Sequence, residues 1–148
     1  MEENRYMLLD YLFKFVESKK TPLNPVLSGY FSKLVIMLLN RKQKQIVPYI
    51  FGSNCKVIER LLFHVYQKSI SEVLQKILNV SEQSYDSSLK IKEKQVNIVI
   101  DLVDQLGARA GNQVEEEASL NACNILGELI GMKEFFNSLS KKTVQAKL

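Results

Sequence analysis

The chain has 148 residues, of which 46% are hydrophobic, and a net charge of +4. This length and composition are enough for one domain with a buried core, spanning residues 1–148, and argue against a disordered chain. The longest unbroken apolar run is the six residues 34–39, far short of the ~20 residues that cross a bilayer. The acidic N-terminal sequence also does not match a secretory signal peptide. We therefore expect a cytoplasmic chain with no membrane segment.

Helical periodicity dominates the sequence. Gly and Pro together number only nine, apolar–polar alternation is scarce, and apolar residues recur at steps of three and four. This pattern predicts an all-α fold of about eight helices.

The first two predicted helices cover residues 5–18 and 25–40. Both are apolar around most of their circumference, so we expect both to be buried on wide faces and the second to be the central helix, with neighbours on more than one side. Asn24 followed by Pro25 is a typical helix start. The expected stripe on the central helix is Leu27, Phe31, Leu34 and Leu38, widened by Val26, Tyr30 and Met37.

Three shorter helices follow. The first, 43–51, contains Pro48, which predicts a kink or a start near Val47. The second covers 55–66. The third covers 70–79, with a capping box formed by residues 69–72.

A polar linker, residues 80–88, separates these helices from the last three, which are predicted over 89–105, 113–130 and 132–139. In the first of these we expect Val96, Val99, Ile100 and Val103 to be buried. Asn112 and Glu115 form a capping-box-like pair for the second.

Paired helices with short connections favour an irregular armadillo/HEAT-like helical repeat, or α-solenoid. The sequence has no visible internal repeat, so an irregular helical bundle is the alternative architecture.

The residues give no sign of catalytic chemistry. His64 is the only histidine and has no second ligand at helical spacing, whereas zinc takes three or four ligands. Cys55 and Cys123 lie within apolar helical patterns, which predicts buried free thiols in a reducing compartment. Phosphate-binding glycine loops and nucleophile motifs are absent from the sequence. We therefore expect no enzymatic activity, catalytic residue, metal or cofactor.

Two groups of basic residues are candidate contacts for an acidic partner. Lys33, Arg41, Lys42 and Lys44 lie on or just past the predicted central helix, and a second group, Lys90, Lys92 and Lys94, opens a later one. The first group is our candidate partner-binding site. A sequence pI near 9.0 leaves a helical-repeat nucleic-acid binder, or a general protein-interaction module, as the alternative. The basic runs lack the interleaved aromatic residues that stack on bases, so we expect no nucleic acid.

Three segments resemble the SAPS family. The most specific match is residues 23–42, in which Leu23-Asn24-Pro25 is followed by Leu27, Phe31, Lys33 and Arg41-Lys42. The other two are residues 63–78 and 118–126. Together they cover most of residues 5–130, and the family domain is longer at both ends.

The resemblance implies a helical-repeat fold and a non-catalytic scaffold. SAPS proteins are regulatory subunits that associate with type 6-like serine/threonine protein phosphatase catalytic subunits. The resemblance therefore implies that such a catalytic subunit is the partner.

Overall fold

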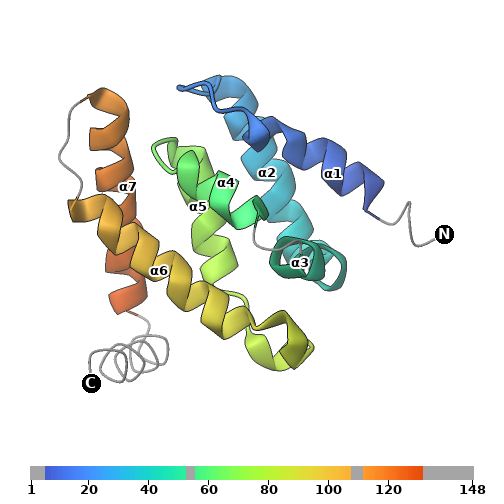
Figure 1. Cartoon of the computed structure of the whole chain (residues 1–148). Helices are drawn as coiled ribbons and strands as arrows, with labels where there is room; N and C mark the ends of the chain where they lie inside the picture. Colours follow the sequence, from blue (N-terminus) through green and yellow to red (C-terminus); the bar gives the residue numbers. More distant parts are fainter. Residues whose placement is uncertain (1–5, 53–55, 108–111, 132–148) are drawn as a thin grey trace.

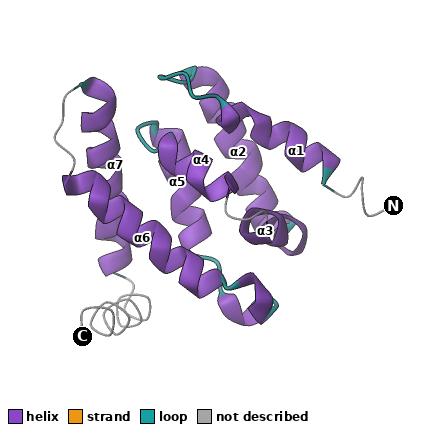
Figure 2. Ribbon diagram, in the orientation of Figure 1, coloured by secondary structure: helices purple, strands orange, loops and turns teal. Residues whose placement is uncertain are grey.

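A computed structural model describes residues 6–52, 56–107 and 112–131 (Figure 1). In these three ranges the chain forms seven α-helices, three short 3₁₀ helices and no strand (Figure 2). The all-α prediction is therefore confirmed. The helix predicted over 132–139 lies outside the described residues.

The helices follow one another with short connections. In chain order they are α1 (Met7–Phe13), η2 (Lys14–Glu17), α2 (Pro25–Arg41), α3 (Gln43–Gly52), α4 (Lys56–Phe63), α5 (Lys68–Leu78), η3 (Glu82–Ser84), η4 (Ser87–Leu89), α6 (Ile91–Gly107) and α7 (Gln113–Ile130). No helix within the described ranges combines the length and apolar character needed to cross a membrane.

The helices pack in two layers. One layer holds α2, α5 and α7, with α5 in the middle, and the other holds α4 and α6, which contact each other and pack on α5 and α7 (Figure 1). The 3₁₀ helix η2 contacts α4, and α3 contacts both α2 and α4. Consecutive helices paired across two layers are compatible with an armadillo/HEAT-like solenoid.

The central helix is α5, so the prediction for residues 25–40 is wrong on this point. Ile70, Val73, Leu74 and Ile77 of α5 have no solvent exposure. They belong to a single apolar cluster that also includes Phe31 of α2. Because α5 is flanked by helices on both sides of its layer, its apolar stripe is enclosed, whereas α2 lies at the edge of the layer.

The first helix is shorter and more exposed than the sequence predicts. Only Phe13 of α1 is buried, and Leu8 and Tyr11 are largely exposed. Phe13 meets Phe31 of α2 edge to face, with ring centroids 5.4 Å apart. The Tyr49 hydroxyl of α3 donates to Asp10 at 2.7 Å, and burial together with the Asp10 carboxylate raises the pKa of Tyr49. One side of α1 is therefore attached to the core and the other faces solvent.

Local start signals place two helices correctly and one incorrectly. Asn24 caps α2 and Asn112 caps α7, each accepting from backbone N–H groups two or three residues on. The predicted capping box at residues 69–72 is wrong, because α5 already begins at Lys68, and its N-cap Gln67 makes no side-chain cap bond.

Two other predictions concern Pro48 and the polar linker. Pro48 lies inside α3, which begins at Gln43 and not near Val47. Residues 80–88 contain η3 and the first two residues of η4, and Val80 at their start is buried. The linker is therefore a short folded connection.

Candidate partner-binding surface

α2 has one buried face and, opposite it, one exposed apolar face. The first, formed by Ser28, Phe31, Ser32, Val35 and Leu39, is buried. The second, which we call the α2 outer face, is formed by Val26, Leu27, Tyr30, Leu34 and Met37, and all five side chains are exposed. The predicted stripe joined residues from both faces and is therefore wrong, because a helix that is apolar all round does not reveal which face has a neighbour.

The four predicted partner-binding residues are all exposed. Lys33 lies on the body of α2, while Arg41 is in its last turn, Lys42 is its C-cap, and Lys44 is in the first turn of α3. At 1.5 Å per residue, Lys33 is about 12 Å from Arg41 along the helix axis. Arg41, Lys42 and Lys44 thus gather at the junction of α2 and α3, and Lys33 stands apart from them. We call these four residues the basic group.

The second basic group does not form a surface cluster. Lys94 is only partly exposed, and its ammonium group donates to the backbone carbonyl of Phe51 at the end of α3. Lys90 lies before α6 in the left-handed backbone region, with φ at 50°. Lys94 therefore joins α6 to α3, which leaves fewer charges here for a partner.

His64 is a buried structural residue. It has no solvent exposure. Its Nδ1 lies 2.9 Å from the Tyr66 hydroxyl and its Nε2 lies 2.6 Å from the carbonyl oxygen of Ser18. The Tyr66 hydroxyl also accepts from the Leu23 N–H at 2.8 Å. A neutral ring with its hydrogen on Nε2 satisfies all of these bonds, with Tyr66 donating to Nδ1. His64 therefore holds the end of α4 against the chain at Ser18 and Leu23.

Buried amides from the later helices donate to buried backbone carbonyls that flank or end α5. Asn121 of α7 donates to the carbonyls of Val65 and Tyr66, both at 2.9 Å. Gln95 of α6 donates to Ile77 at 3.0 Å and to Val80 at 2.9 Å. Helix ends leave carbonyls without intrahelical partners. These two side chains therefore fasten the α6–α7 pair to both ends of α5. Neither role has a signal in the sequence, because each partner lies far along the chain.

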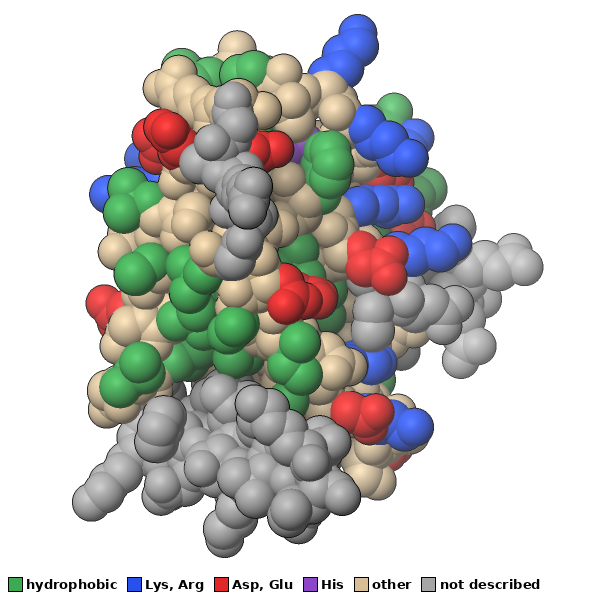
Figure 3. Space-filling view, turned by 60° about the vertical axis from the view of Figure 1, so that its left-hand side comes forward, with side chains coloured by type: hydrophobic (Ala, Val, Ile, Leu, Met, Phe, Trp, Pro, Cys, Tyr) green, Lys and Arg blue, Asp and Glu red, His purple; other side chains and the backbone are tan. Residues whose placement is uncertain are grey.

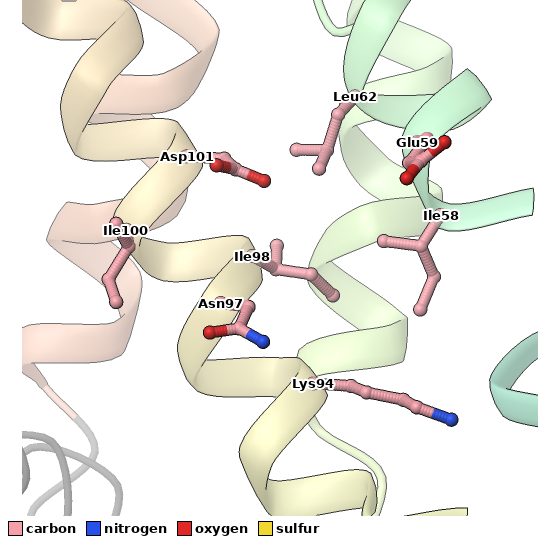
Figure 4. Close-up of a pocket in the computed structure, with 8 residues that line it drawn as sticks. All are labelled: Ile58, Glu59, Leu62, Lys94, Asn97, Ile98, Ile100 and Asp101. Carbon is pink, nitrogen blue, oxygen red and sulfur yellow. The ribbon is translucent and has the colours of Figure 1, made fainter. Parts of the chain in front are cut away.

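A groove of about 320 Å³ runs between α4 and α6 (Figure 4). Ile58 and Leu62 of α4 and Ile98 of α6 form its apolar side, and Glu59 and Asp101 lie at its border. Partial burial raises the pKa of Asp101, and the charges of Asp104 and Glu59 raise it further. Lys94 also lines the groove, and its ammonium group donates to the carbonyl of Phe51.

An apolar area also occurs on the side of α6 and α7 (Figure 3). Val96 and Val99 are buried as predicted, but Ile100 and Val103 are about half exposed, because the buried line of α6 runs through Ile91, Ile98 and Leu102. Leu106, Leu120 and Ile130 are exposed as well.

The cysteine prediction is only partly testable. Cys123 is a free thiol but is exposed on α7, so its predicted burial is wrong. Cys55 lies outside the described residues. Across the described ranges, no three His, Cys, Asp or Glu side chains are grouped closely enough to hold a metal ion.

Comparison with known proteins identifies the family. Residues 35–146 match the family model described as SAPS, SIT4 phosphatase-associated protein. Human serine/threonine-protein phosphatase 6 regulatory subunit 1 is 28% identical over 80% of this chain and 13% of its own length. Mouse regulatory subunit 2 is 24% identical over 93% of this chain and 14% of its own length. No solved structure gives a significant match.

The chain spans about one seventh of the length of these curated relatives. The relatives are named as regulatory subunits and not as catalytic ones, in agreement with the absence of an enzymatic role expected from the sequence. The family match covers the C-terminal part of α2, from residue 35, and every described helix after it. The chain belongs to the SAPS family.

Proposed function

We propose that this chain is a non-catalytic regulatory domain that binds a serine/threonine protein phosphatase catalytic subunit of type 6. The observation that supports this most is the family match over residues 35–146, together with relatives named as phosphatase 6 regulatory subunits. The fold is consistent with this function because a stack of paired helices presents an extended surface.

We propose that the basic group provides part of the contact. Arg41, Lys42 and Lys44 lie within four positions at the α2–α3 junction, and all three are exposed. In the described part of the chain none of them has an ion-pair partner. An acidic surface on the catalytic subunit would meet these charges without first breaking a bond within the chain. Such rim charges act mainly on the association rate and its salt dependence.

The test is binding of the purified chain to a purified type 6 catalytic subunit, measured by biolayer interferometry at two salt concentrations. We expect the Arg41→Glu, Lys42→Glu double variant to bind at least tenfold more weakly than the unmodified chain at low salt, with slower association. The matched control is Lys76→Glu, since Lys76 is an exposed residue in the last turn of α5.

Two results would count against the proposal at different levels. A folded chain that does not bind the catalytic subunit contradicts the proposed function. Normal binding by the double variant contradicts only the role of the basic group. Titration with single-stranded and duplex oligonucleotides separates this function from nucleic-acid binding, which would weaken steeply with salt.

A further inference from the structure

The α2 outer face is an apolar strip of regular geometry. Its five side chains are between 41% and 66% exposed. Val26, Tyr30, Leu34 and Met37 follow one another at steps of four, four and three, which places them along one side of the helix. At 1.5 Å per residue, the strip is about 16 Å long. Isolated exposed apolar residues are common on proteins, but a contiguous strip indicates an interaction surface.

The position of α2 suggests the shape of the occupant. In the layer of α2, α5 and α7, α2 contacts α5 through its buried face, and the outer face points away from that contact. No described helix covers the outer face. A helix laid along it would extend the layer by one member and would repeat the side-by-side contact between α2 and α5. A helix is therefore the element that fits this strip best.

The charges beside the strip determine the chemistry of the occupant. Lys33 and Arg41 lie four residues before and four residues after Met37, so all three share one side of α2. Both cations are exposed, and α2 contains no Asp or Glu between Pro25 and Arg41. An apolar strip with cations at its border is complementary to a helix whose apolar stripe is bordered by carboxylates.

The same charges argue against a second copy of this chain as the occupant. If two copies paired through α2, Lys33 and Arg41 of each would meet a helix that offers no acidic residue. In an antiparallel symmetric pair, the two Lys33 side chains would also lie on the same edge of the contact. Like charges placed together in this way are unfavourable.

We propose that the α2 outer face is a docking site for an amphipathic helix of a partner protein, with Asp or Glu bordering the apolar stripe of that helix. Recognition of this type, in which an amphipathic helix lays its apolar face on an apolar surface, uses side chains at helical spacing as anchors. The proposal does not depend on the identity of the phosphatase.

The test uses two designed 20-residue helical peptides with the same leucine stripe, bordered by Glu in one and by Lys in the other. Binding of each fluorescent peptide to the purified chain is measured by anisotropy. We expect the Glu-bordered peptide to bind at least tenfold more tightly than the Lys-bordered one. Leu34→Glu in the chain should weaken that binding at least tenfold, and Lys33→Glu should abolish the preference between the peptides.

Leu120→Glu is the matched control, because Leu120 is an exposed leucine on a different helix, and binding should be unchanged in this variant. Circular dichroism verifies that each variant is folded. Equal binding of the two peptides, failure of both to bind at 1 mM, or an unchanged affinity in Leu34→Glu would overturn the proposal. Concentration-dependent dimerisation that Leu34→Glu removes would overturn it in favour of self-association.

Discussion

At the scale of single residues, His64 makes folding sensitive to pH. Burial lowers the pKa of its imidazole below the ordinary 6.5, against the opposing effect of the nearby backbone carbonyls. A protonated ring would bring a hydrogen on Nδ1 towards the Tyr66 hydroxyl. The Tyr66 hydroxyl, which also accepts from Leu23, would then lose Nδ1 as the acceptor for its own hydrogen. The native state therefore favours neutral His64.

The expected result is a free energy of unfolding that is constant above about pH 7.5 and decreases as the pH falls below 6.5. The sign follows because the unfolded chain binds a proton near pH 6.5 while native His64 binds it only at a lower pH, so acid favours unfolding. One proton gives a slope of at most about 1.4 kcal/mol per pH unit.

Urea unfolding between pH 5.5 and 8.0 measures this dependence. His64 is the only histidine in the chain, so the slope near pH 6 should disappear in His64→Gln even though that variant is less stable overall. A slope of equal size in both proteins would show that another group titrates.

Truncation of Asn121 on α7 is expected to cost far more than truncation of an exposed asparagine on the same helix. Asn121→Ala removes the donors from two buried carbonyls, those of Val65 and Tyr66, which should lower the free energy of unfolding by about 2–3 kcal/mol. Asn124→Ala, at an exposed position on the same helix, should change it by less than about 0.5 kcal/mol. Similar losses in the two variants would contradict this structural role.

Sequence reasoning succeeded for residues whose partners are local. Asn24 and Asn112 bind N–H groups within three positions, and the pattern of neighbouring residues is enough to predict such caps. His64 binds Ser18, 46 positions away, and Asn121 binds Val65, 56 positions away. These contacts depend on how the helices pack, which helical periodicity does not determine.

At the scale of elements, α2 and α5 show the same limit. Both carry strong apolar patterns, and the longer and more apolar one was predicted to be central. The structure places the shorter α5 in the middle of its layer and leaves one apolar face of α2 exposed. Periodicity predicted the existence of these helices well, including the bounds of α7 at residues 113–130. It did not predict their order in space, and so did not identify the α2 outer face.

The connection between η4 and α6 contains a strained position. Lys90 has a φ of 50°, where a side chain with a Cβ atom costs roughly 1–2 kcal/mol. Its backbone bonds to Ser87 and Lys94 do not involve the side chain. Lys90→Gly should therefore raise the free energy of unfolding by about 1 kcal/mol.

Urea unfolding of Lys90→Gly is best compared with that of Lys76→Gly. Lys76 lies within α5, where glycine should lower stability by about 1 kcal/mol. Destabilisation of both variants would mean that Lys90 is not strained in the native state.

At the scale of the whole molecule, the buried amides and His64 join successive helices, and the α2 edge carries one of the exposed apolar faces together with the basic group. The resemblance to the family could be seen in residues 23–42, 63–78 and 118–126 together, and the family model matches residues 35–146. Which side chains of α2 are exposed depends instead on how the helices pack.

The most direct test is hydroxyl-radical footprinting of the chain alone and in complex with a type 6 phosphatase catalytic subunit. Tyr30 and Met37 are exposed on the α2 outer face, and Cys123 is exposed on α7. We predict that oxidation of Tyr30 and Met37 falls several-fold in the complex while oxidation of Cys123 is unchanged. Protection of Cys123 with no protection of Tyr30 or Met37 would contradict α2 as the binding edge.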